Sequence, residues 1–216
     1  MRIVVLGGTG QVGRMVVEKL ERRSGAAARE FFETTTQRLL EAEKRAGVKH
    51  HVVLSIVGAD HAGEDGYFAA KGVQENLVRS GPIAHSILRS TQFYDFARQI
   101  AEWNTAQDTV HLPPKAVQPV AASDVAEALV DLAMGDPLGG AVDFGGPEQM
   151  PLPDFVRRVL RVDHDPRYVV EDAETTTLGF NISGDLLLPR SPQRLASTTL
   201  DAWVHEEGRR LVAGIR

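Results

Sequence analysis

The stretch Arg2–Gly13, RIVVLGGTGQVG, decides the fold class. Its first part, Arg2–Leu6, is apolar almost throughout, which is typical of an inner strand of a parallel sheet whose two faces are both covered. Glycines follow, and then apolar residues recur at helical spacing up to about Arg22. The chain is therefore expected to open with a strand, a glycine-rich turn and a helix.

The glycine-rich turn has the spacing of a nucleotide-binding turn. Its residues are Gly7, Gly8, Thr9, Gly10, Gln11, Val12 and Gly13. The early glycines permit a tight turn and a close approach of the backbone to a pyrophosphate, while Gly13 lets the helix pack against the strand. The N-terminus of the helix adds free N–H groups and a partial positive charge. We expect these residues to bind a dinucleotide, and the alternative is a plain strand-to-helix turn.

Strands and helices alternate along the rest of the chain. The apolar periodicity predicts helices over 26–46, 67–79, 92–103, 124–134, 152–160 and 200–212, and strands over 51–57, 83–88, 117–120 and 141–144. Gly47 is expected to end the first of these helices, and Ser123 to cap the helix over 124–134. The alternation indicates an α/β fold with a Rossmann-type, doubly wound parallel sheet. We expect a dinucleotide-binding domain over 1–138 and a smaller C-terminal substrate lobe over 139–216.

The segment around Ser24 departs from this pattern. A doubly wound sheet places a second strand soon after its first helix, and the end of that strand carries the charged residue that binds the ribose. Here Arg22–Gly25 leads directly into another helix. Because one βαβ unit takes about 30 residues, we predict that the second and third strands, roughly 40 residues, are absent near Ser24. The sequence therefore does not distinguish NAD from NADP.

Composition excludes several classes of function. The chain of 216 residues has 24 Lys and Arg against 29 Asp and Glu, so it has no basic field for nucleic acid. The absence of cysteine excludes disulfides, thiolate catalysis and cysteine-bound metals. No apolar run is long enough to span a bilayer, and the N-terminus lacks a secretory pattern, so we expect a cytoplasmic protein without membrane partners.

Other polar and aromatic groups have ordinary interpretations. Asp163-His164-Asp165 precedes Pro166 and favours a polar turn over a metal site, so no metal is expected. On the helix over 26–46 the predicted apolar stripe comprises Ala28, Phe31, Phe32, Thr35, Leu39, Ala42 and Ala46. We interpret its two phenylalanines as core or interface residues. Asp124 is expected to complement a helix dipole.

Tyr67 and Lys71 form the clearest candidate for chemistry. They lie four residues apart on a predicted helix, so both project from one face. An ammonium that close stabilises a phenolate and makes the tyrosine a usable proton donor and acceptor. Ser55 lies near the C-terminal end of a predicted strand, the end at which parallel sheets bind ligands. The alternatives are a surface tyrosine, a solvated lysine and an ordinary serine.

Four segments together give the chain a family resemblance: Gly7–Gly13, Leu54–Asp60 (LSIVGAD), Tyr67-x-x-x-Lys71 and Ile87–Phe93 (ILRSTQF). From Met1 to about Gly146 the chain resembles the short-chain dehydrogenase/reductase superfamily, and within it the NmrA-like, NAD(P)-binding branch often described as nucleoside-diphosphate-sugar epimerase-like. The resemblance implies that Tyr67 is the catalytic acid/base, that Lys71 binds the nicotinamide ribose and that Ser55 orients the substrate carbonyl.

The resemblance also implies a pocket wall and a cofactor. Arg89 and Thr91 would contact NADP or NAD, and Gln92 and Phe93 the substrate. We therefore expect an NAD(P)(H)-dependent oxidoreductase that acts on a small carbonyl or quinone substrate, with a homodimer as a candidate assembly. Two alternatives remain open, a non-catalytic NAD(P)-sensing regulatory protein and a nucleotide-sugar epimerase-like enzyme.

Overall fold

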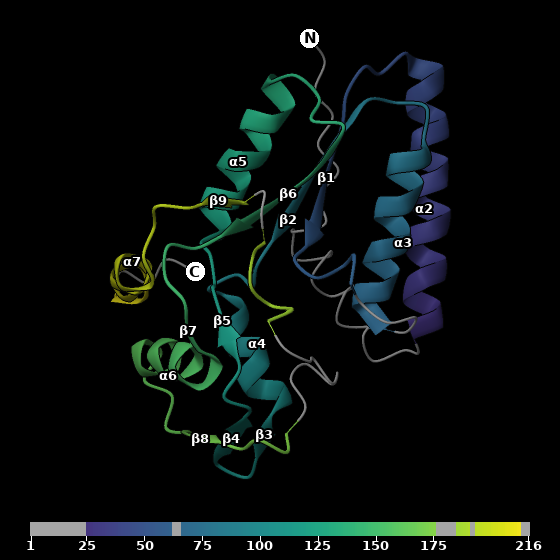
Figure 1. Cartoon of the computed structure of the whole chain (residues 1–216). Coiled ribbons are helices and arrows are strands. Elements are labelled where there is room, and N and C mark those ends of the chain that lie inside the picture. Colours follow the sequence, from purple (N-terminus) through teal and green to yellow (C-terminus); the bar gives the residue numbers. More distant parts are fainter. Residues whose placement is uncertain (1–24, 62–65, 176–184, 191–192, 213–216) are drawn as a thin grey trace. The chain divides into compact units, whose positions relative to one another are not determined.

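A computed structural model describes residues 25–61, 66–175, 185–190 and 193–212 (Figure 1). The predicted strand Arg2–Leu6, the glycine-rich turn, the first helix and the predicted gap near Ser24 lie outside these residues. Those predictions therefore stay predictions. None of the helices in the described part of the chain is both long and apolar enough to span a bilayer.

Four strands form the central sheet, in the order β1-β2-β6-β9. They are β1 (His51–Ile56), β2 (His85–Ser90), β6 (Gly140–Gly145) and β9 (Gln193–Leu195). Strand β9 pairs in parallel with β6, with Asp143 opposite Gln193. The parallel sheet and its alternation with helices confirm the predicted α/β fold. By its internal contacts the chain divides into two compact units, Met1–Leu88 with Leu129–Ala141 and Arg89–Ala128 with Val142–Arg216.

In the first unit, helices α2 (Gly25–Ala46) and α3 (Gly66–Ser80) lie side by side (Figure 1). The buried residues of α2 recur every four positions: Ala28, Phe32, Thr36 and Leu40. The predicted stripe was therefore right at Ala28 and Phe32 and wrong elsewhere, since Phe31 is 41% exposed and none of the other predicted members is buried. Ala28 and Phe32 pack with Ala70 of α3.

Two glycines have structural roles in this helix pair, one at the end of α2 and one inside α3. Gly47 has a φ of +68°, a backbone conformation that favours glycine, and it ends α2 as predicted. Gly72 lies inside α3, where a Cβ would stand 2.7 Å from the main-chain oxygen of Ala59. Because Ala59 follows β1 within three residues, Gly72 lets α3 approach the C-terminal end of that strand closely.

The remaining elements belong to the second unit, except that α5 continues from the second unit into the first after Ala128. They are α4 (Phe96–Trp103), β3 (Thr105–Ala106), β4 (Thr109–Leu112), β5 (Ala116–Val117), α5 (Ala122–Met134), β7 (Met150–Pro151), α6 (Leu152–Val162), β8 (Tyr168–Glu171) and α7 (Leu200–Val212). Strands β3, β4 and β8 form one small sheet, and β5 pairs with β7. Tyr94 and Phe155 are fully buried in this unit, with ring centroids 6.3 Å apart.

Several predicted boundaries are wrong. Helix α4 begins at Phe96 rather than residue 92, and β2 runs over 85–90 rather than 83–88. Helix α5 begins at Ala122, so Ser123 lies inside its first turn and is no cap. Asp124 lies in the first turn, as predicted, and also accepts hydrogen bonds from the backbone N and the hydroxyl of Thr198. Strands β3, β4, β7, β8 and β9 were not predicted, because two to four residues give no readable alternation.

Candidate active site

Lys71 is buried against the end of strand β1 in the first unit. Its Nζ donates a hydrogen bond of 2.8 Å to the main-chain oxygen of Leu54, and another to the side-chain oxygen of Gln74. Burial lowers the pKa of Lys71 to about 8, against the attraction of Glu75, which raises it. The ammonium is therefore mainly charged at pH 7, and it is held by two neutral oxygens.

Tyr67 lies one turn before Lys71 on α3, as the spacing predicts. It is partly buried and packs against the cluster of Ala28, Phe32 and Ala70. The rings of Phe32 and Tyr67 meet edge to face, with centroids 5.8 Å apart. The same Phe32 ring lies 4.9 Å from Lys71 Nζ, within the range of a cation–π interaction. Phe32 thus contacts both members of the predicted pair.

Ser55 follows Leu54 near the C-terminal end of β1 and is 1% exposed. Its Oγ is buried and has no hydrogen-bond partner among the described residues. Leaving a buried hydroxyl unpaired costs about 1–3 kcal/mol, so such groups call for an explanation. A ligand oxygen at the strand end would supply the partner. The structure brings Ser55 and Lys71 to one end of β1 through the Lys71–Leu54 hydrogen bond.

The second unit contains the other predicted contact residues. Arg89 is buried, and its guanidinium lies 3.9 Å from a carboxylate oxygen of Asp143. The hydroxyl of Thr91 donates to the main-chain oxygen of Gln118 at 2.6 Å. The side-chain oxygen of Gln92 is buried without a partner in the described part of the chain, and Phe93 is half-buried. The side-chain oxygen of Gln92 is therefore available to accept a hydrogen bond from a ligand.

The predicted pyrophosphate-binding residues Gly7–Gly13 lie outside the described residues, so the cofactor can be tested only against the remaining groups. In the first unit, the unpaired Ser55 hydroxyl fits a ligand that offers a hydroxyl or amide group at the end of β1. Lys71 supplies positive charge at the strand end. Ser55 and Lys71 together fit a polar ligand such as a nicotinamide nucleoside.

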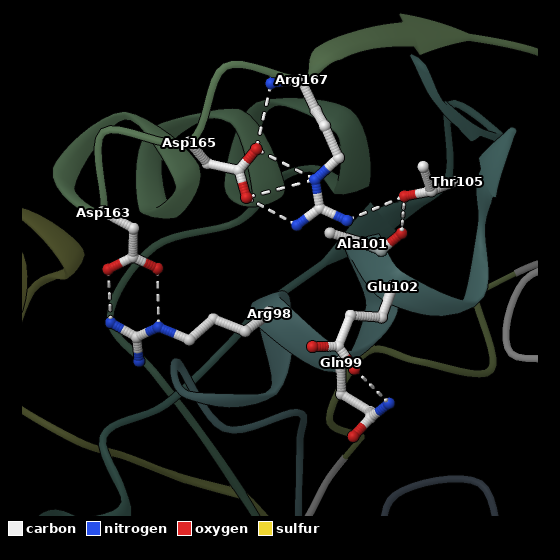
Figure 2. Close-up of polar contacts among 8 residues, drawn as sticks. All are labelled: Arg98, Gln99, Ala101, Glu102, Thr105, Asp163, Asp165 and Arg167. Carbon is white, nitrogen blue, oxygen red and sulfur yellow. Dashed lines mark hydrogen bonds and ion pairs between the residues drawn. The ribbon is translucent and has the colours of Figure 1, made fainter. Parts of the chain in front are cut away.

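The segment Asp163-His164-Asp165 forms a turn at the end of α6 (Figure 2). His164 has a φ of +54°. Asp163 accepts hydrogen bonds from Nε and Nη2 of Arg98 at 2.7 and 2.9 Å. Asp165 binds the guanidinium of Arg167, which also donates to the hydroxyl of Thr105 (Figure 2). Both carboxylates are thus engaged by arginines, and the predicted polar turn is confirmed.

Two residues around Lys71 were missed by the sequence interpretation. Gln74 lies three positions after Lys71, where a helix brings a side chain to the same face, so this spacing could have identified it. Phe32 comes from a different helix, about forty positions earlier in the sequence. No local pattern links it to Lys71, and only the packing of α2 on α3 places it there.

Comparison with known proteins supports the fold. No family model matches the chain, and no curated protein matches its sequence. The solved structure of MoeE5 in complex with UDP-glucose and NAD has a TM-score of 0.58 at 17% identity, with 84% of this chain and 71% of that chain covered. A UDP-Glc/GlcNAc 4-epimerase from Campylobacter jejuni has a TM-score of 0.57 at 13% identity, with 72% and 61% covered.

A dTDP-4-dehydrorhamnose reductase from Clostridium acetobutylicum has a TM-score of 0.56 at 13% identity, with 96% of this chain and 98% of that chain covered. The chain thus spans less than two thirds of the epimerase and nearly all of the reductase. At these identities the likeness establishes the Rossmann-like fold, and activity has to be argued from the site.

Proposed function

We propose that this protein is an NAD(P)(H)-dependent oxidoreductase that transfers hydride between the nicotinamide and a small carbonyl or quinone substrate. The observation that carries the proposal is the buried Lys71 ammonium, which is held by neutral oxygens one helical turn from Tyr67. Such an arrangement costs folding free energy, because neutral oxygens compensate a buried charge poorly. Costly polar arrangements of this kind occur preferentially at functional sites.

In the proposed reduction, Tyr67 donates its phenolic proton to the substrate oxygen, and the Lys71 ammonium stabilises the phenolate that remains. The Ser55 hydroxyl donates a hydrogen bond to the same oxygen while negative charge develops on it. The reduced nicotinamide, when bound, supplies the hydride to the carbonyl carbon. In the reverse direction Tyr67 accepts the proton of the alcohol.

The binding residues follow from the same proposal. The turn Gly7–Gly13 would hold the pyrophosphate of NADP or NAD. Arg89 and Thr91 would contact the cofactor, while Gln92 and Phe93 would contact the substrate. The unpaired oxygen of Gln92 favours a substrate that offers a hydrogen-bond donor there.

A nucleotide sugar is the second candidate substrate. MoeE5 was solved with UDP-glucose and NAD, and the two other neighbours described above are a UDP-sugar epimerase and a dTDP-sugar reductase. Oxidation or epimerisation of a sugar would use the same Tyr67, Lys71 and Ser55 in proton transfer at a ring hydroxyl. The two candidates therefore differ in the substrate and share the proton-transfer roles of Tyr67, Lys71 and Ser55.

One experiment separates these alternatives. The full chain is titrated with NADH and NADPH by fluorescence, and turnover is then measured on a panel of aldehydes, quinones, UDP-sugars and dTDP-sugars. Turnover of an aldehyde or quinone supports the proposal, and turnover restricted to nucleotide sugars supports the second candidate. Cofactor binding without any turnover would replace both by a dinucleotide-sensing protein. Failure to bind either cofactor would contradict all three.

A further inference from the structure

We propose that Phe32 of helix α2 is a positioning residue for the Tyr67–Lys71 pair, one that keeps the buried ammonium charged and fixes the phenol beside it. As a statement about catalysis, this inference rests on the proposed function. As a statement about the two side chains, it rests on their packing alone. Phe32 is 8% exposed, and its ring contacts both residues.

The hydrogen-bond capacity of Lys71 gives the first argument. An ammonium has three N–H donors. The Leu54 main-chain oxygen and the Gln74 side-chain oxygen accept two of them. The face of Phe32, 4.9 Å from Nζ, offers the negative side of a ring quadrupole to the charge. The ring thus favours the charged form of a lysine that has been removed from water.

The choice of an aromatic ring rather than a carboxylate gives the second argument. A carboxylate at this place would also keep Lys71 charged, but it would cancel the field of the ammonium at Tyr67. A phenyl ring adds no net charge and leaves that field intact. Glu75 is the charged group that acts on Lys71 from α3, and it is also paired with Arg79 at 3.6 Å. Phe32 therefore stabilises the ammonium without neutralising it.

The packing of Tyr67 gives the third argument. Its ring meets that of Phe32 at an interplanar angle of 66°. A ring held edge to face in a buried cluster has few alternative rotamers. One side chain from α2 thus restricts the orientation of the phenol and the position of the ammonium together. The adjacent Phe31 also packs on Phe32, at 5.5 Å, but is 41% exposed, which makes it a matched control.

The test measures the pKa of Lys71 in the full chain without cofactor. Lysine Cε and Hε signals are followed by NMR from pH 6 to 11, and Lys71→Met identifies the Lys71 signal. The main variant carries 3,4,5-trifluorophenylalanine at position 32, introduced by codon suppression. This ring keeps nearly the same shape but has a much weaker negative face. Phe32→Leu and Phe31→Leu complete the set.

The fluorinated ring and Phe32→Leu are expected to lower the pKa of Lys71 by about 0.5, the size of a modest cation–π interaction. Phe31→Leu is expected to leave it unchanged. Should Phe32→Leu fail to fold, the fluorinated variant decides alone. An unchanged Lys71 pKa in the folded fluorinated variant would overturn the proposal, and so would an equal change in Phe31→Leu.

Turnover provides the readout for catalysis. With a carbonyl substrate, Phe32→Leu is expected to lower kcat several-fold with little change in KM, and Phe32→Tyr, which restores a ring, to recover most of it. If the pKa changes as expected but the parent protein turns over no substrate, the proposed function fails and the effect of Phe32 on Lys71 stands. If Phe32→Leu changes the pKa but leaves kcat unaltered, the catalytic part of the proposal is wrong.

Discussion

Lys71 in the first unit is buried, and Arg98 in the second unit is partly buried. The positive charges of the two side chains are compensated in different ways. Lys71 donates to a main-chain oxygen and an amide oxygen, both neutral. Arg98 binds the Asp163 carboxylate through two nitrogens and lies 3.7 Å from Glu207. Burial lowers the pKa of Lys71 to about 8, whereas the hydrogen bonds with Asp163 raise the pKa of Arg98.

The difference separates a structural cation from one that is suited to chemistry. Arg98 joins α4 to the end of α6 and to α7, and its charge is balanced by the carboxylates that it binds. Its contact with the ring of Trp203 adds to this packing. Lys71 keeps a positive field that the two oxygens it binds do not neutralise. A cation held by neutral groups therefore identifies the candidate site better than a dense network of ion pairs does.

The largest expected effect concerns Tyr67, the residue on which the positive field of the Lys71 ammonium acts. Tyr67→Phe removes the transferable proton and leaves the ring in place, so reduction of an aldehyde or ketone should fall roughly a hundredfold or more. Cofactor affinity, measured by fluorescence titration, should be retained. Tyr168→Phe is the control, since Tyr168 is 69% exposed on β8. Wild-type turnover in Tyr67→Phe would show that the hydroxyl takes no part in the reaction.

Replacing each cation by methionine tests the comparison itself. Arg98→Met removes the ion pairs of Arg98 with Asp163 and Glu207, so the free energy of unfolding should fall by roughly 1–2 kcal/mol. Lys71→Met fills the same space without a buried charge, so at pH 7 the protein should be as stable as the wild type or more stable. Urea denaturation measures both. A loss in Lys71→Met as large as that in Arg98→Met would contradict the distinction.

The pH dependence of stability sharpens the same point. The folded-state pKa of Lys71, about 8, lies below its usual 10.5, so the unfolded chain binds more protons between these values. Stability should therefore rise as the pH goes from about 8 to 10.5, by at most about 1.4 kcal/mol for each pH unit. Other groups titrate in this range too, so the relevant quantity is the wild type minus Lys71→Met. A flat difference from pH 7 to 10.5 would show that Lys71 is not desolvated.

Sequence patterns predicted the elements of the first unit better than those of the second. Helix α2 and strand β1 were located within one residue, because long amphipathic and short apolar runs have clear periods. The Tyr67–Lys71 spacing identified the pair, since an interval of four residues on a helix fixes a shared face. Phe32 and the oxygens of Leu54 and Gln74 surround the Lys71 ammonium, and their convergence depends on how α2, α3 and β1 pack.

The prediction with the smallest expected effect concerns Gly72. It tests how closely the Lys71 site depends on the packing of α3 near β1. In Gly72→Ala the new Cβ would stand 2.7 Å from the main-chain oxygen of Ala59, a backbone atom that yields only if α3 moves. Helix propensity opposes this cost with a gain of about 1 kcal/mol, so the net loss of stability should be small, roughly 1 kcal/mol. The displacement should also loosen the bond from Lys71 to Leu54, admit water and raise the Lys71 pKa toward its usual value.

Gly140→Ala is the matched control for this last change, because a Cβ at Gly140 meets no atom within 4 Å. Gly140→Ala should raise the free energy of unfolding by a few tenths of a kcal/mol, because alanine makes the unfolded chain less flexible. It should leave the Lys71 pKa unchanged. Urea denaturation and the NMR titration of Lys71 measure both quantities. If Gly72→Ala is more stable than the wild type by the full helix-propensity difference of about 1 kcal/mol, α3 is not held close to Ala59 in the loop between β1 and α3. The low pKa of Lys71 would then come from its burial in the packing of α2 on α3 rather than from close contact with β1.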